Sequence, residues 1–184
     1  MYETPLRHFV NDILLGFKNR NQKKLRKLND IILKEAVLHF TKPTFELGVF
    51  AYILSKLVSK TRFLKKQNDV KFKEIEAILK DLSKNIDRLP ESQCLLLFRD
   101  LENDIIQLEE EDKRYITNLV TKGRLKAAAL LYAQGVSIGV ASDVTGINKQ
   151  DIQSYAGKTR MFDRLEEPIS IKDRMKIAHK LIGG

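Results

Sequence analysis

The sequence has no tryptophan, one cysteine, four prolines and nine glycines in 184 residues. A single thiol excludes an intramolecular disulfide and a zinc site built from cysteines, and Cys94 lies in an apolar run that favours a buried thiol. The scarcity of proline and glycine leaves long intervals rich in Leu, Ile, Lys and Glu. These intervals favour helices over strands.

Segments typical of membrane and secreted proteins are also missing. No run of eighteen apolar residues occurs, and the first eight residues carry charge where a secretory signal needs its apolar stretch. Burial in a core accounts for the apolar faces of the expected helices, so no membrane-surface helix is needed. We therefore expect a cytoplasmic protein with no membrane partner.

No pattern of residues indicates catalysis or a bound metal. The three histidines, His8, His39 and His179, do not share the spacing of metal ligands. No Ser/His/Asp arrangement and no pair of carboxylates stands out either. We expect no cofactor, no metal and no enzymatic activity.

The net charge of +9 is unevenly distributed. Residues 1–66 hold 14 Lys and Arg against 5 Asp and Glu, residues 67–121 hold 8 against 13, and residues 122–184 hold 11 against 6. Two basic ends therefore flank an acidic middle. Basic segments attract phosphate backbones, ribosomal RNA or anionic membranes, and this attraction weakens as salt increases.

Apolar residues recur every three or four positions through most of the chain, which is the spacing of one helix face. Five helices are expected before residue 122, at about residues 5–20, 23–40, 44–58, 69–89 and 91–121. Thr44 is expected to cap the third of them. The fourth and fifth, joined by a short turn containing Pro90, should form a long antiparallel hairpin.

Residues 124–157 contain the most informative pattern, in which Gly135 and Gly146 separate three short helical segments. Helices that cross steeply at a tight turn need small residues where their backbones meet, and Ala141 and Ser142 provide them. Gly146 can adopt the positive φ that the turn requires. The other turn and core positions are Ile147, which buries the turn, Asn148, which caps the next helix, and Ile152 and Tyr155, which point to the core.

This segment, from Ser142-Asp-Val-Thr-Gly-Ile to Asn148-Lys-Gln-Asp-Ile, resembles the core of helix-turn-helix DNA-binding proteins. It departs from the family pattern at Ser142, where alanine is preferred, and at Thr145, where an aliphatic residue is more usual. In the family, the second helix of the unit enters the major groove. The resemblance therefore implies a recognition helix at residues 148–156, with base contacts from Lys149, Gln150 and Gln153.

Basic residues outside the recognition helix are candidates for phosphate contacts. They follow that helix or lie near the N-terminus: Lys158, Arg160, Arg164, Lys23, Lys24, Arg26 and Lys27. A second basic group comprises Lys56, Lys60, Arg62, Lys65 and Lys66. Either basic group near the N-terminus could instead be an ordinary solvated helix face.

The sequence thus predicts an all-α fold of eight or nine helices. An N-terminal bundle would span residues 1–121, basic over 1–66 and acidic over the hairpin 67–121, and a helix-turn-helix domain with a C-terminal helix opened by Ser170 would span 122–184. We expect a DNA-binding regulator of transcription or a chromosome-associated protein. A protein-interaction adaptor and an RNA- or ribosome-binding protein are the alternatives. The apolar seam from Phe98 to Leu119 would serve either a homodimer or the hairpin itself.

Overall fold

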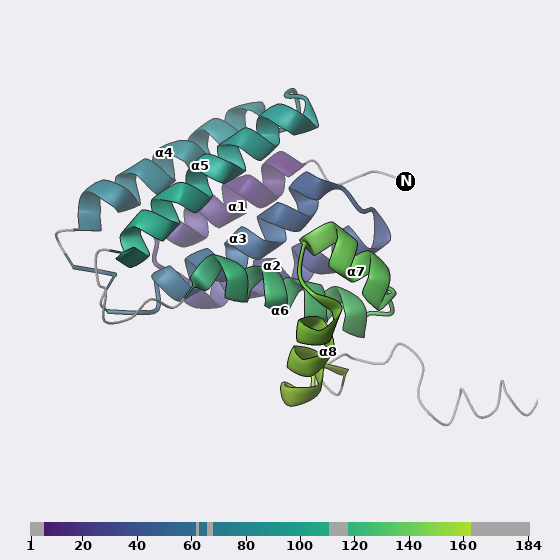
Figure 1. Cartoon of the computed structure of the whole chain (residues 1–184). Helices are drawn as coiled ribbons and strands as arrows, with labels where there is room; N and C mark the ends of the chain where they lie inside the picture. The colour runs from purple at the N-terminus through teal and green to yellow at the C-terminus, as the bar shows by residue number, and fades with distance from the viewer. Residues whose placement is uncertain (1–5, 62, 66–67, 111–117, 163–184) are drawn as a thin grey trace, which may run out of the picture.

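The computed structural model describes residues 6–61, 63–65, 68–110 and 118–162, and this part of the chain folds into helices without a strand. The predicted all-α class is confirmed. Eight helices are present in the described residues (Figure 1): α1 Leu6–Lys18, α2 Gln22–Leu38, α3 Lys42–Leu57, α4 Asp69–Asn85, α5 Glu91–Glu110, α6 Leu119–Ala133, α7 Ile138–Thr145 and α8 Lys149–Lys158. The helix expected after Ser170 lies outside the described residues.

Helix α3 forms the centre of the molecule. It packs against α1, α2, α5 and α6, and its side chains are buried on almost every face. A helix that is apolar all round can be stable in water only when other helices enclose it. Between Pro43 and Val58 only Tyr52 and Lys56 are partly exposed.

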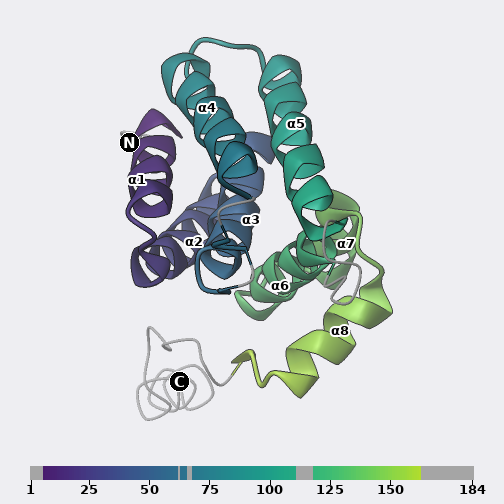
Figure 2. The same ribbon diagram turned by 90° about the vertical axis from the view of Figure 1, so that its left-hand side faces the viewer.

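Helices α4 and α5 lie side by side on the side of the molecule away from α8, and α5 also contacts α6 (Figures 1 and 2). Two stacked pairs of rings join these helices to the rest, with Phe17 and Phe72 5.1 Å apart and Phe50 and Phe98 5.6 Å apart between ring centroids. Cys94 is buried near the start of α5, as the apolar run around it predicts. No helix in the described ranges is both long and apolar enough to cross a membrane.

The start of α3 differs from the prediction. Thr41, and not Thr44, is the N-cap: its hydroxyl accepts a hydrogen bond from the backbone N–H of Thr44, and Pro43 occupies the first turn. Proline is well suited to the first turn because its missing N–H has no helical partner there. The prediction was wrong because it treated Pro43 as a stop and not as part of the helix.

The end of α5 also differs. The described part of α5 extends to Glu110, and the chain does not continue as one helix to about Thr121, because a separate helix, α6, begins at Leu119. Asn118 precedes it with φ of 46°, a left-handed conformation that cannot lie inside a right-handed helix. Both oxygens of Glu109 accept a hydrogen bond from the N–H of Leu119, so the end of α5 satisfies a free donor at the start of α6.

Helix α6 approaches α3 closely through Gly123. A Cβ atom added at Gly123 would lie 2.8 Å from Cγ1 of Ile53, a distance that real side chains do not tolerate. Next to it, Arg124 forms ion pairs with Glu46 of α3 and Glu102 of α5. Burial lowers the pKa of Arg124, but the hydrogen bonds and charges of these two carboxylates together raise it above its usual value. The group that connects α6 to the bundle is therefore charged.

Replacing Gly123 by alanine should push α6 away from α3. We expect Gly123→Ala to lower the free energy of unfolding by about 1–3 kcal/mol, the usual cost of adding a methyl group to a full core. Gly157→Ala is the matched control, since nothing lies within 4 Å of its added Cβ and the position is helical. That control should be neutral or more stable by up to about 1 kcal/mol. Urea unfolding measures both, and equal stability of the two variants would contradict the close approach.

Candidate nucleic-acid interface

Helices α6, α7 and α8 form a unit in which each helix packs against the other two. The loop after α6 contains Gly135 with φ of 100°, and the Ser137 hydroxyl caps α7 by accepting a hydrogen bond from the N–H of Val140. Gly146 ends α7 with φ of 70°, as expected for a tight turn. Asn148 then caps α8 through a 2.8 Å hydrogen bond from the N–H of Gln150. The local signals in the sequence therefore place both short helices correctly.

Buried side chains and the hydroxyl of Thr145 stabilise the turn between α7 and α8. Ala141 and Ile152 are fully buried, Ile147 packs against the core from a half-buried position, and Ser142 is half-buried. The Thr145 hydroxyl donates a 2.7 Å hydrogen bond to the carbonyl of Ala141 and accepts one from the N–H of Ile147. A buried hydroxyl is tolerated when its hydrogen bonds are made. Threonine can therefore occupy this position, where the resembled family more often has an aliphatic residue.

The faces of α8 differ in exposure. Ile152 and Ala156 are fully buried and Tyr155 is half-buried, whereas Lys149, Gln150 and Gln153 are exposed. The sequence had assigned Ile152 and Tyr155 to the inner face but missed Ala156, which is small and follows Ile152 by four residues. In two views at right angles α8 lies at the edge of the molecule (Figures 1 and 2). Its outward side chains are accessible to a large ligand.

The chain just after α8 returns to α6. Met161 is buried, and the ring of Phe162 packs edge-to-face against Tyr132 of α6 with 5.4 Å between the ring centroids. Lys158 and Arg160 lie exposed in this stretch, at the C-terminal end of α8. Arg164, the third basic residue expected there, lies outside the described residues.

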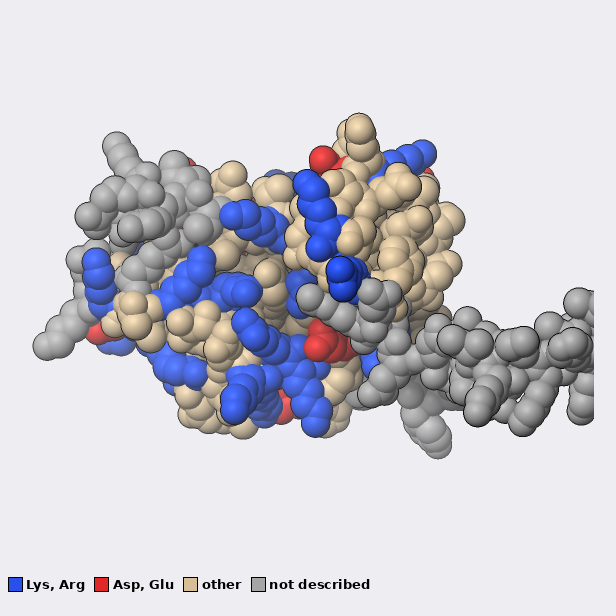
Figure 3. Space-filling view, turned by 90° about the horizontal axis from the view of Figure 1, so that it is seen from below, with Lys and Arg blue, Asp and Glu red and all other residues tan. Residues whose placement is uncertain are grey.

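The basic residues of α2 do not form one uniform set. Lys23, Arg26 and Lys27 are exposed, but Lys24 is half-buried and its ammonium forms a 2.7 Å ion pair with Asp12 of α1. Lys24 therefore contributes to packing α1 against α2, and part of its charge is already neutralised. Seen from below, Lys and Arg side chains cover much of the face formed by the lower helices, with few acidic side chains between them (Figure 3).

Comparisons with protein-family models, curated proteins and solved structures found no match. The geometry of α6–α8 and the charges near these helices are therefore the observations that bear on function. The helix-turn-helix resemblance and the division into two domains stay predictions.

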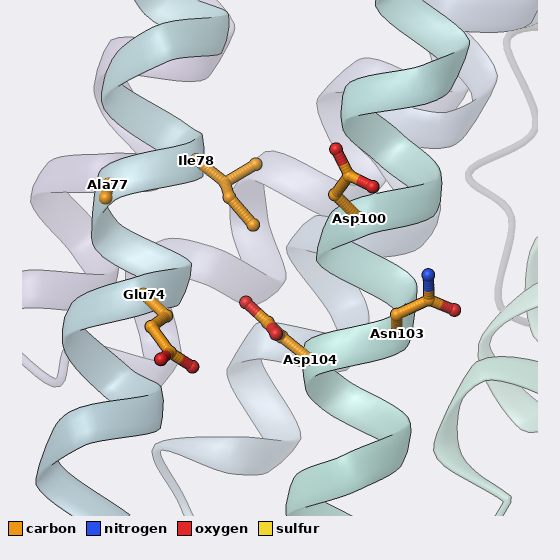
Figure 4. A pocket seen from close by; sticks show the side chains of 6 residues that line it. All are labelled: Glu74, Ala77, Ile78, Asp100, Asn103 and Asp104. Carbon is orange, nitrogen blue, oxygen red and sulfur yellow. The ribbon is translucent and has the colours of Figure 1, made fainter.

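An acidic groove lies between α4 and α5. Its volume is about 480 Å³, and Figure 4 shows Glu74 and Asp104 pointing into it from the two helices. The ammonium of Lys71 lies 2.7 Å from Glu74 and 3.5 Å from Asp104, so both carboxylates already share a cation. The groove is open and lined by carboxylates, which would repel a polyanion.

The turn at Gly146 can be tested by substitution. Gly146→Ala should lower the free energy of unfolding by about 1–2 kcal/mol because a Cβ atom disfavours the left-handed conformation, although nothing lies within 4 Å of the added atom. Gly146→Asn should lose less, because asparagine adopts this conformation more readily. Gly139→Ala, in α7 with only Ser137 Oγ nearby, is the control and should not destabilise. The free energy of unfolding of each variant is measured by thermal unfolding. Equal changes for Gly139→Ala and Gly146→Ala would contradict the left-handed turn at Gly146.

Proposed function

We propose that this protein binds duplex DNA through α8, as a transcriptional or chromosome-associated regulator. The observation that carries the proposal is the orientation of α8: the helix packs against α6 and buries Ile152 and Ala156, whereas Lys149, Gln150 and Gln153 are exposed to solvent. In helix-turn-helix proteins that bind DNA, the helix that follows the tight turn reads bases in the major groove.

The dimensions and the chemistry of α8 support this role. An α-helix with its side chains is about 10–12 Å wide, and the major groove is about 12 Å wide, so a single helix fits. Lysine donates to the O6 and N7 acceptors of guanine, and glutamine can form two hydrogen bonds with adenine. Lys149, Gln150 and Gln153 are three of the four exposed residues among the first five of α8, and the fourth is Asp151.

Phosphate contacts would come from positions on both sides of the recognition helix. Lys158 and Arg160 lie at its C-terminal end, and Lys23, Arg26 and Lys27 extend the positive surface along α2. Contacts of this kind fix the orientation of a protein on the duplex and carry little sequence information. Affinity is therefore expected to depend on salt, and specificity on α8.

The base contacts are tested by binding selection on random duplex DNA at two salt concentrations. Lys149→Ala and Gln153→Ala should each relax sequence preference at one position, by about 1–3 kcal/mol or about 5- to 150-fold. Lys73→Ala on α4 and Gln107→Ala on α5 are matched controls, because both residues are exposed and distant from α8 in the chain. An unchanged preference in both α8 variants would reject α8 as the recognition helix.

The phosphate contacts predict a different response. Neutralising Lys23, Arg26 and Lys27 together should weaken binding to every duplex by a similar factor, because these side chains would contact only the backbone. Adding Lys24→Gln should have a smaller effect on binding, since Lys24 already pairs with Asp12. Retention on a heparin or DNA column as a function of salt measures both. An adaptor that binds proteins would show little salt-dependent retention, and an RNA-binding protein would be displaced from DNA by structured RNA.

A further inference from the structure

Helix α3 is buried on most of its surface and reaches solvent along one narrow strip. Tyr52 and Lys56 are the only partly exposed residues between Pro43 and Val58, and they are four positions apart. Residues with this spacing lie next to each other on one helix face. The strip therefore exposes one aromatic ring and one ammonium group in an otherwise buried helix.

Two lysines from different helices approach the ring of Tyr52. The ammonium of Lys126 in α6 lies 4.3 Å from the ring centroid, and that of Lys56 lies 5.2 Å from it. Lys126 also donates a 3.1 Å hydrogen bond to Oδ1 of Asn29. Asn29 is buried and donates in turn to the carbonyl of Gly48, at 2.8 Å. The ammonium of Lys126 is thus held in place by the core.

A third positive charge comes from Arg26 of α2. Burial lowers the pKa of Lys56, and the charge of Arg26 lowers it further, so the two cations are close enough to repel each other. Neither Arg26 nor Lys56 forms an ion pair with a carboxylate of the described residues. An anion bound between Arg26 and Lys56 would remove the repulsion between these two cations.

The group of Arg26, Tyr52, Lys56 and Lys126 is here called the Tyr52 cluster, and it includes a residue of α6, the helix against which α8 packs. Burial raises the pKa of Tyr52, and the neighbouring Tyr155 of α8 raises it further. Helices α2, α6 and α8 form the lower side of the molecule in Figure 1, the side whose basic surface Figure 3 shows. A long polyanion in contact with α8 would meet this cluster without bending round the molecule.

We infer that the Tyr52 cluster is a phosphate-binding site that holds the backbone of the same DNA duplex whose groove α8 enters. This inference depends on the proposed function for the identity of its ligand. Lysine, arginine and tyrosine side chains are all common donors to phosphate oxygens. Because the cluster joins α2, α3 and α6, a phosphate bound there fixes the duplex to the bundle as well as to α8.

The inference is tested with the full chain carrying Arg26→Gln and Lys56→Gln. The matched control carries Lys73→Gln and Lys80→Gln, two exposed lysines of α4, so that both variants lose two positive charges. Duplex affinity is measured by fluorescence anisotropy between 50 and 200 mM salt. Each lost phosphate contact reduces the salt slope by about 0.9, so the cluster variant should lose about 1.8 and bind all sequences about 10- to 100-fold more weakly. The control should keep the slope of the unmodified protein.

Tripolyphosphate, measured by calorimetry, tests the anion site without DNA. It should bind the unmodified protein and the control alike, and the cluster variant at least about tenfold more weakly. Equal salt slopes and equal tripolyphosphate binding in the two variants would overturn the inference and leave the role of α8 intact. If the unmodified protein binds no duplex, the proposed function is rejected and DNA is not the ligand. Binding of tripolyphosphate that depends on the cluster would in that case still indicate a phosphate site.

If the double variant does not fold, the single variant Arg26→Gln, at an exposed position, is measured in its place. Its salt slope should be smaller by about 0.9.

Discussion

The close approach of α6 to α3 at Gly123 is the contact on which the arrangement of the proposed DNA-binding surface depends. The absence of a side chain at Gly123 lets Ile53 pack directly against the α6 backbone. Arg124, the next residue, pairs with Glu46 and Glu102, and Lys126, three residues after Gly123, reaches Asn29 and Tyr52. About one turn of helix therefore contains the packing, the ion pairs and one cation of the Tyr52 cluster.

The position of α6 also sets the position of α8. Helix α8 packs against α6 and buries Ile152 and Ala156, and the chain after it returns to Tyr132 of α6 through Phe162. Specific and non-specific contacts to a nucleic acid make different demands on a protein, since base contacts need a helix in a fixed orientation and phosphate contacts need only positive charge within reach. The proposed recognition helix and the basic residues of α2 and α3 lie around one shared helix, α6, so the proposed arrangement provides for both kinds of contact.

The elements that the sequence predicted well are those with local causes. The periodicity of apolar residues locates the helices, and Gly146 and Asn148 determine the α7–α8 turn from positions two residues apart. The break before α6 was missed because apolar residues continue with helical spacing across Asn118, whose left-handed conformation leaves no signal in that pattern. The Tyr52 cluster was also missed as a unit. Its members lie at positions 26, 52, 56 and 126, and only the packing of three helices brings them together.

The location of the acidic groove between α4 and α5 has a consequence for the charge distribution of the molecule. It lies at the end opposite the basic surface, since α4 and α5 lie at one side of the bundle and α2, α6 and α8 at the other (Figures 1 and 2). Charges of opposite sign at opposite ends give the molecule an electric dipole moment. In the field of a polyanion such a molecule rotates before it makes contact. For the proposed duplex ligand, collisions through the α4–α5 end would become rarer and the rate of association through α8 would rise, although the groove would not contact the DNA.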